Sequence, residues 1–268
     1  MDKSYALFLL VMLYNSFVYT QHDLIRGNTP ELESPAHASI EYVKKKYEHK
    51  TNDIDYLWYP AKKPKQLWII FGGAIPDRYS RWSWFWNSEE QWEDISYLFL
   101  RDDNRTWYFG TPEQPLTETY CSIIKDVMLA SHLSEKDIFM IGNSMGGYAA
   151  LRFGLLLGVR GILAIRPQTE WMSAVQFHGV KKLSGLWIDI EDLILQSNHI
   201  PFIYLHFGIF GPDKQAIKKC LKALSVKPST IIIEKTNELS HSHGFPNKNQ
   251  TLSIINYMNN IPQPFLEK

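Results

Sequence analysis

The sequence predicts an α/β protein with a mostly parallel central sheet and helices on both faces. Short apolar runs typical of buried strands alternate with segments of helical periodicity along most of the 268 residues. A glycine-flanked turn carrying a serine follows one of these strands and leads into a helix. A chain of this length can bury one sizeable core, so one main α/β domain is expected.

The bulk composition excludes several classes of partner. Acidic and basic residues balance at 28 each, so we expect no nucleic-acid interface. The two cysteines, Cys121 and Cys220, are too few for a disulfide framework and are expected to be buried thiols. No Cys/His spacing resembles a zinc site, and no Walker or dinucleotide glycine pattern occurs, so neither a bound metal nor a bound cofactor is expected.

The N-terminus carries an apolar segment of uncertain use. Residues 4–21 have no charge, and residues 6–13 form a dense apolar run behind Lys3, as in a signal peptide or a weak membrane anchor. The run is short and no small-x-small cleavage site follows, so a helix packed on the domain, or a start codon assigned too early, are the alternatives. We expect a cytoplasmic protein with membrane contact through residues 5–19, or else export through an N-terminal signal.

Residues 22–50 are polar and include the basic run 44–46. They are typical of a linker followed by a surface helix over residues 39–47, with the lysines on its solvated face. The expected organisation is therefore an N-terminal apolar segment, linker and surface helix over residues 1–50, and an α/β domain over residues 51–268.

The first strands of that domain lead to an informative loop. Ile54–Tyr59 and Gln66–Phe71 read as β segments joined by a turn with Pro60 and Pro64, and a hairpin is the simplest interpretation. The second segment runs into Gly72-Gly-Ala74, as a buried central strand followed by a tight loop requires. Such a loop can direct a backbone N–H at a reacting oxygen. The alternative is a turn that uses glycine for backbone geometry alone.

An aromatic loop follows directly. Residues 78–86 contain five aromatic side chains and two arginines, which is unusual for a solvated loop. Flat aromatic faces suit sugar rings or an acyl group, and arginine suits a carboxylate or phosphate. The loop is thus a candidate substrate wall, with a hydrophobic lid or an ordinary helix end as the alternative. The proposed substrate contacts are Tyr79, Trp82, Trp84 and Trp86.

The rest of the chain continues the alternation of strand and helix. Expected strands cover residues 97–100, 106–109, 138–141, 160–165, 201–207 and 229–234, and expected helices cover residues 117–132, 184–197, 214–224 and 248–259, with a further helix starting at about Met145.

The central motif is Gly142-Asn-Ser-Met-Gly146, which fits the G-x-S-x-G nucleophile elbow. A serine on a sharp strand-to-helix turn has strained backbone, and glycine on both sides relieves the crowding. The helix N-terminus beneath the serine supplies free N–H groups and a positive dipole end, both useful to an oxyanion. The alternative is a Gly-Ser turn without chemistry.

A serine hydroxyl needs a neighbouring base, and histidine oriented by an acid suits that task. In nucleophile-elbow enzymes the chain order is Ser, then Asp or Glu, then His. Ser144, Asp213 and His243 follow that order at the ends of three predicted strands. His243 is preferred because Gly244 follows it. The alternatives are His241 as the base, and Asp189, Asp192 or Glu238 as the acid.

Over residues 54–259 the chain resembles the α/β-hydrolases, and among them the bacterial capsule polysaccharide O-acetyltransferases. The resemblance rests on the following segments: Phe71-Gly-Gly-Ala74, Gly142-Asn-Ser-Met-Gly-Gly147, Pro167-Gln168, Gly211-Pro-Asp213 and His243-Gly244. It implies an α/β-hydrolase fold and a catalytic triad of Ser144, His243 and Asp213. It also implies an oxyanion hole formed by the N–H groups of Met145 and of Gly73 or Ala74.

The expected activity is serine-dependent acyl-ester chemistry through an acyl-enzyme. The acyl group, acetyl by the resemblance, would be transferred to or removed from a bacterial surface glycan, and acetyl-CoA would be the donor for a transferase. The alternatives are a general carboxylesterase or thioesterase acting on a small acyl ester, and a non-catalytic accessory or binding protein that keeps the hydrolase fold.

Overall fold

The computed structural model describes residues 39–76, 78–80, 82, 94–178, 183, 185–208, 212–227, 231–236 and 248–260. All of them belong to one compact unit, Ala38–Lys268. The apolar segment at residues 5–19 lies outside the described residues. None of the helices in the described part of the chain is long and apolar enough to cross a membrane.

The described strands and helices alternate as an α/β protein requires. The strands are β1 (Glu48–Thr51), β2 (Ile54–Tyr59), β3 (Gln66–Phe71), β4 (Ile95–Leu100), β5 (Ile138–Asn143), β6 (Gly161–Ile165), β7 (Phe202–Gly208) and β8 (Ile231–Thr236). The helices are α2 (Ile40–Tyr47), α4 (Thr117–Ala130), the 3₁₀ helix η2 (Glu135–Asp137), α5 (Met145–Leu157), α6 (Trp171–His178), α7 (Ile190–Gln196), α8 (Pro212–Ser225) and α9 (Lys248–Asn260).

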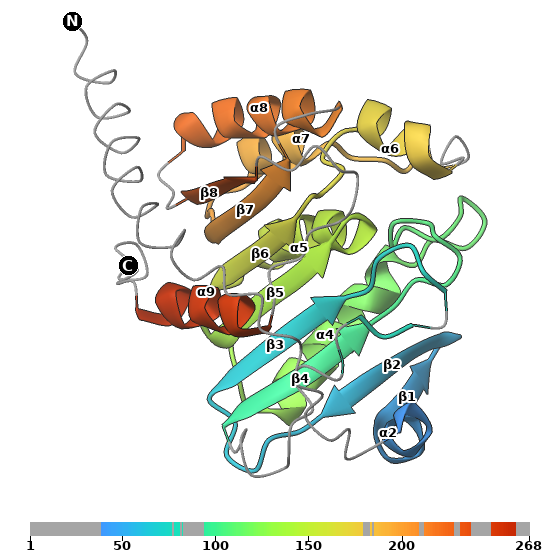
Figure 1. The fold of residues 1–268 in the computed structure, drawn as a ribbon. Coiled ribbons are helices and arrows are strands. Elements are labelled where there is room, and N and C mark those ends of the chain that lie inside the picture. Colours follow the sequence, from blue (N-terminus) through green and yellow to red (C-terminus); the bar gives the residue numbers. More distant parts are fainter. Residues whose placement is uncertain are drawn as a thin grey trace, which may run out of the picture. The chain divides into compact units, whose positions relative to one another are not determined.

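These strands form one sheet in the order β1-β2-β4-β3-β5-β6-β7-β8 (Figure 1). The β1/β2 and β2/β4 pairs are antiparallel, and every other neighbouring pair is parallel. The predicted fold class, α/β with a mostly parallel sheet, is confirmed. Strands β3, β4, β5 and β6 are buried along nearly all of their length and are mostly apolar, which is why the sequence shows them as apolar runs.

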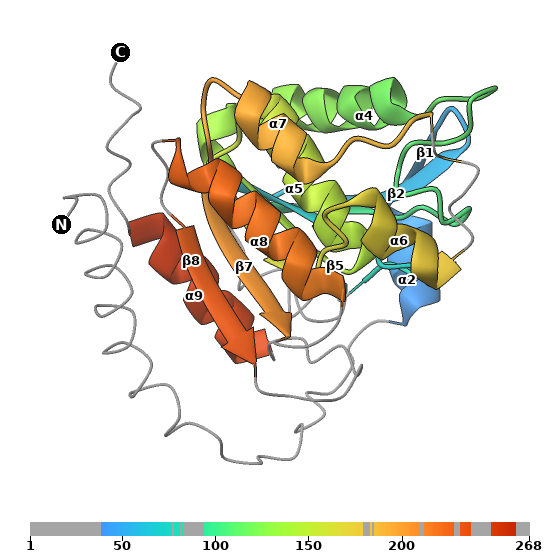
Figure 2. The same ribbon diagram turned by 90° about the horizontal axis from the view of Figure 1, so that it is seen from above.

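Helices cover both faces of the sheet (Figure 2). One core cluster joins the sheet to α4, α5, α7 and α8, through residues such as Ile124, Leu151, Ile194 and Ile217. The other cluster joins the opposite face to α2 and α9, through Val43, Ile255 and Met258.

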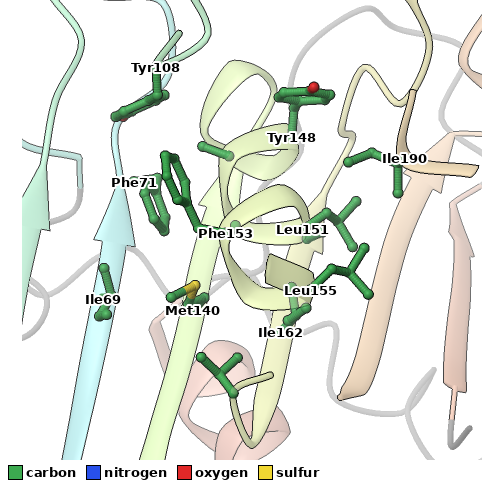
Figure 3. Close-up of a cluster of buried hydrophobic side chains, with 14 of the residues drawn as sticks. Ile69, Phe71, Tyr108, Met140, Tyr148, Leu151, Phe153, Leu155, Ile162 and Ile190 are labelled. Atoms are coloured by element: carbon green, nitrogen blue, oxygen red, sulfur yellow. The ribbon is translucent and has the colours of Figure 1, made fainter. Parts of the chain in front are cut away.

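The centre of the larger cluster lies where β3 and β5 meet α5 (Figure 3). The rings of Phe71 and Phe153 stack at 5.6 Å, and Tyr108 contacts Phe71 edge-on at 5.3 Å. Helix α5 is buried from Met145 to Leu155 on every side, which accounts for its nearly continuous apolar sequence. It ends at Gly158, whose φ of 64° is the left-handed conformation that terminates helices.

Three expectations about the elements are wrong. Strand β2 does not form a hairpin with β3, because it pairs with β4 and β1. The hairpin is β1–β2, closed by Asn52 and Asp53 at φ 47° and 65°, the conformation of a tight two-residue turn. Residues 106–109 are a turn and not the expected strand. A helix was expected over residues 184–197, but α7 begins only at Ile190.

Candidate active site

Ser144 occupies the sharp turn between β5 and α5. Its φ of 53° and ψ of −123° lie in a strained region for a residue with a side chain. The turn is held by two main-chain bonds, from Ser144 N to Ile165 O at 2.9 Å and from Tyr148 N to Ser144 O at 3.0 Å. The Ser144 hydroxyl makes no capping bond to α5, so it is directed away from the helix and the residue remains half exposed.

The two glycines of the motif are required by close packing of backbone. A Cβ on Gly142 would lie 2.0 Å from the carbonyl oxygen of Gly146. A Cβ on Gly146 would lie 2.4 Å from Phe71 O and 2.7 Å from Gly72 O. The first turn of α5 therefore packs directly on the end of β3, and the G-x-S-x-G spacing reflects that approach.

The register of the sheet brings two loops beside Ser144. Phe71 pairs with Gly142, so the loop Gly72–Ala74 follows at the level of the elbow on the β3 side. Asn143 pairs with Ile165, so residues 166–168 lie at the same level on the β6 side. The carboxyl ends of three neighbouring parallel strands thus meet at the serine.

Gln168 contacts the serine hydroxyl. The sequence drew attention to the Pro167-Gln168 pair but did not predict this contact. The Ser144 Oγ donates to Gln168 Oε1 at 3.3 Å, while Gln168 Nε2 donates to Arg166 O at 3.3 Å. The second bond fixes which end of the buried amide faces the serine. A neutral amide oxygen can hold the hydroxyl proton in place but is not basic enough to remove it.

The predicted oxyanion donors lie beside the elbow. Met145 is the first residue of α5 and is fully buried, and the N–H groups of a first helical turn have no partner within the helix. Gly73 and Ala74 are half buried after β3. A Cβ on Gly73 would lie 3.5 Å from Asn143 Oδ1, so this loop packs against the residue that precedes the serine. The role of Met145, and of Gly73 or Ala74, as oxyanion donors stays a prediction.

The turn after β4 is built on a buried carboxylate. Asp102 Oδ2 accepts the N–H groups of Thr106 at 2.6 Å and Tyr108 at 2.9 Å, and the Thr106 hydroxyl at 3.1 Å. Burial raises the pKa of Asp102, and these hydrogen bonds oppose that shift. The bonds hold Trp107 and Tyr108 at φ 52° and 62°, so the apolar run 106–109 cannot form a strand.

Five aromatic rings gather next to the first turn of α5. Trp187 stacks on Tyr148 at 4.4 Å and contacts three further rings at 5.7–6.2 Å. This aromatic cluster consists of Trp107, Phe109, Tyr148, Trp171 and Trp187. Trp171 and Trp187 are half exposed, whereas the other three are buried.

Asp189 supports the aromatic cluster, which bears on its candidacy as a catalytic acid. Its Oδ1 accepts the Trp187 Nε1–H at 2.7 Å and the Trp171 N–H at 2.9 Å. The Tyr148 hydroxyl donates to Ile188 O at 2.6 Å, one residue earlier. These contacts give Asp189 a structural task in holding the two half-exposed tryptophans.

The aromatic loop 78–86 fits its predicted role poorly where it is described. Tyr79 is only 1% exposed, its hydroxyl donates to Glu48 Oε1 at 2.7 Å, and Arg101 lies over its ring at 4.8 Å. The buried ring and the engaged hydroxyl count against a substrate contact by Tyr79, which stays a prediction. Trp82 is half buried against the α2/α9 side of the core. Trp84 and Trp86 lie outside the described residues.

The other two members of the predicted triad are only partly described. Asp213 is the second residue of α8, so it belongs to a helix N-terminus and not to the loop expected after β7. His243 and its alternative His241 lie outside the described residues, as does Glu238. Among the residues that the structure describes, no group of three or more His, Cys, Asp or Glu side chains could hold a metal ion.

Comparison with known proteins identifies the fold. No protein-family model and no curated protein matches the sequence. Among solved structures, fluorophosphonate-binding serine hydrolase F of Staphylococcus aureus matches with a TM-score of 0.60 and 15% identity, over 80% of this chain and 97% of that one. The capsule O-acetyltransferase of Neisseria meningitidis serogroup A matches with a TM-score of 0.60 and 18% identity, over 80% and 94%.

S-formylglutathione hydrolase of Staphylococcus aureus matches with a TM-score of 0.60 and 14% identity, over 80% of this chain and 97% of that one. All three proteins are similar to this chain over most of their own length. At these identities the likeness concerns the fold, and the fold is that of the α/β-hydrolases.

Proposed function

We propose that this chain, which has the α/β-hydrolase fold, is a serine-dependent enzyme that cleaves or transfers acyl esters through an acyl-enzyme intermediate. The observation that carries the proposal is the geometry of Ser144. A half-exposed serine at φ 53°, with its hydroxyl turned away from a helix N-terminus, costs stability that a structural turn would not need. The structural likeness to serine hydrolases and to an O-acetyltransferase supports the same reading.

In the proposed mechanism the Ser144 Oγ attacks the acyl carbonyl carbon and gives its proton to His243, which Asp213 orients. The negative charge that develops on the carbonyl oxygen is stabilised by the N–H of Met145 and by a second N–H from the Gly72–Ala74 loop. Collapse of the tetrahedral intermediate releases the alcohol or thiol, which takes the proton from His243. The acyl-enzyme is then resolved by water or by an acceptor hydroxyl.

Transfer of an acetyl group involving a bacterial surface glycan is the form of this chemistry that we favour. Support comes from the likeness to the meningococcal capsule O-acetyltransferase, one structure of which contains CoA. Trp171 and Trp187 are partly buried in the aromatic cluster that adjoins the first turn of α5 at Tyr148, and aromatic side chains of this kind are suited to stacking on sugar rings. Simple hydrolysis of a small ester is the second candidate, favoured by the likeness to S-formylglutathione hydrolase.

Labelling with a fluorophosphonate probe tests the proposal. We expect one adduct on Ser144 in the folded wild type and none in Ser144→Ala. The control is Ser131→Ala, which removes a buried hydroxyl at the C-terminal end of α4 and should leave labelling unchanged. Absence of any adduct in the folded wild type would make the chain a non-catalytic member of the fold.

A second experiment separates the two outcomes of the acyl-enzyme. The protein is incubated with acetyl-CoA, with and without glycan acceptors, and CoA release is compared with acetylated product. Product that accumulates in step with CoA supports a transferase. CoA release that is independent of acceptor supports a hydrolase.

A further inference from the structure

The hydroxyl of Tyr108 reaches the loop that we propose for the oxyanion hole. It lies 2.9 Å from Gly72 O and 3.2 Å from Leu100 O. A phenol has one proton to donate, and Leu100 O already accepts the N–H of Gly72 at 2.8 Å. The shorter contact, to Gly72 O, is therefore the one that the phenol proton satisfies.

Tyr108 is itself rigidly held. Its side chain is fully buried between the rings of Phe71 at 5.3 Å and Tyr120 at 4.9 Å, and Figure 3 shows it over the end of β3. Its N–H is bonded to the buried Asp102 carboxylate. Burial raises the pKa of the Tyr108 phenol well above its ordinary value, so the group stays protonated and remains a donor.

Because the peptide bond is planar, the hydrogen bond from Tyr108 to Gly72 O also fixes the direction of the Gly73 N–H. The carbonyl of Gly72 and the N–H of Gly73 belong to one trans peptide plane and point in opposite directions. Gly72 O points into the buried layer that contains Tyr108 and approaches the first turn of α5 at Gly146. The Gly73 N–H is thus directed out of that layer, on the half-exposed side of the loop.

We propose that Tyr108 is a positioning residue for the oxyanion hole: its hydroxyl locks the Gly72–Gly73 peptide so that the Gly73 N–H, and not that of Ala74, is the second oxyanion donor. This inference rests on the proposed function. Ala74 belongs instead to a tight turn, closed by the bond from Ile75 N to Gly73 O at 2.8 Å, that leads to the exposed Ile75.

A lock is needed because this peptide has glycine on both sides. Rotation of a peptide plane by half a turn changes ψ of the first residue and φ of the second, and glycine accepts the new angles with little cost. Gly73 now has a negative φ, so the flipped peptide would place it at positive φ. The flipped state would point the Gly72 carbonyl oxygen at the site and remove the donor.

The test compares two buried tyrosines. Tyr108→Phe deletes the hydroxyl that holds Gly72 O, whereas Tyr120→Phe deletes a neighbouring buried hydroxyl that donates to Arg101 O at 2.9 Å. We expect Tyr108→Phe to lower kcat for p-nitrophenyl acetate by about 10- to 100-fold with KM changed less than about twofold, since loss of one oxyanion donor costs about 100- to 1,000-fold. Tyr120→Phe should keep kcat within about twofold at a similar loss of Tm.

Two further measurements distinguish positioning from general loosening. Affinity for a trifluoromethyl ketone, whose adduct carries the oxyanion, should fall in Tyr108→Phe by the same factor as kcat/KM. The cost of Tyr108→Phe should also shrink in a Gly73→Ala background, because alanine disfavours the positive φ of the flipped peptide. Each cost is measured against its own parent.

The outcomes separate this inference from the proposed function. If the wild type is not labelled by fluorophosphonate, the proposed function fails and the inference falls with it. If the wild type is labelled but Tyr108→Phe and Tyr120→Phe behave alike, the inference alone is overturned. Should Tyr108→Phe not fold, the backbone ester Gly73→glycolic acid removes only the donor N–H. A loss of kcat of about 100-fold or more would support the inference, and an unchanged kcat would overturn it.

Discussion

The hydroxyl of Ser144 donates to Gln168 Oε1 at 3.3 Å, across the boundary between β5 and β6. The bond fixes the serine rotamer from a neighbouring strand and not from the helix below it. Gln168 is in turn fixed by its own bond to Arg166 O. The hydroxyl of the proposed nucleophile is therefore oriented by a buried amide before any substrate binds.

Gln168→Leu should lower kcat/KM for a small ester by about 3- to 10-fold, because one neutral hydrogen bond contributes about 0.5–1.5 kcal/mol to the orientation of the serine. The loss is measured from steady-state kinetics at one pH. Gln114→Leu, at an exposed turn position, is the matched control and should match the wild type. A loss above about 1,000-fold would show that Gln168 acts on the transition state itself and not on the resting rotamer.

Gly146→Ala should destabilise the protein by about 3 kcal/mol or more, because the new methyl group meets main-chain oxygens of Phe71 and Gly72 that cannot move aside. Gly185→Ala adds the same methyl group with nothing within 4 Å and should change stability by less than about 1 kcal/mol. Thermal unfolding followed by circular dichroism measures both. Equal melting temperatures for the two variants would contradict the close approach of α5 to β3.

Both cysteines should be unreactive in the folded protein. Burial raises the pKa of the Cys220 thiol to about 12 and also raises that of Cys121, so neither is an appreciable thiolate at pH 8. Iodoacetamide at pH 8 should leave esterase activity intact, and both thiols should react with Ellman's reagent only after unfolding. Inactivation in step with modification of one cysteine would point to a thiol in the mechanism.

The raised pKa of the Cys220 thiol makes the stability of the protein depend on pH. The Cys220 thiol has a higher pKa in the folded state than its ordinary value of about 8.5. Its contribution is therefore fully present below about pH 8.5 and is lost as the pH rises towards 12, because the unfolded chain releases the proton first. Cys220→Ala should show a shallower fall of the free energy of unfolding between pH 8.5 and 10.5 than the wild type.

Tyr79→Phe should cost about 1–2 kcal/mol of stability through loss of the bond to Glu48, and should leave kcat and KM within about twofold. Trp171→Ala should instead raise KM, because this tryptophan is half exposed beside the loop that carries Gln168. Chemical denaturation and steady-state kinetics on both variants give the comparison. A raised KM in Tyr79→Phe with unchanged stability would return Tyr79 to the substrate wall.

The sequence predicts the central elements well, since their signals are local. Strands β5 and β6 lie within two residues of their expected positions, and helix α5 begins at the expected residue. A short apolar run that ends or begins at a glycine indicates a buried strand and also marks its boundary. The prediction that β2 pairs with β3 was wrong. Its true neighbour, β4, lies about 40 residues further along the chain, and local sequence signals do not report such a distant contact.

Residues 106–109 show a second limit of sequence reasoning. Their threonine and three aromatic side chains have strand propensity. The buried carboxylate of Asp102 accepts the N–H groups of Thr106 and Tyr108, and these bonds override that propensity. The contact of Gln168 with Ser144 and the task of Asp189 were hidden in the same way, because each depends on side chains from elements far apart in the sequence.

The site is assembled from stretches near residues 72, 102–108, 144–148 and 166–168, contributed by four neighbouring strands. None of these stretches can supply a nucleophile, an acceptor and an oxyanion donor alone. During refolding, turnover should therefore return only after the parallel pairings of β4, β3, β5 and β6 are complete, later than the bulk recovery of helical signal. Recovery of catalytic activity would then report when the last, long-range stage of folding is complete.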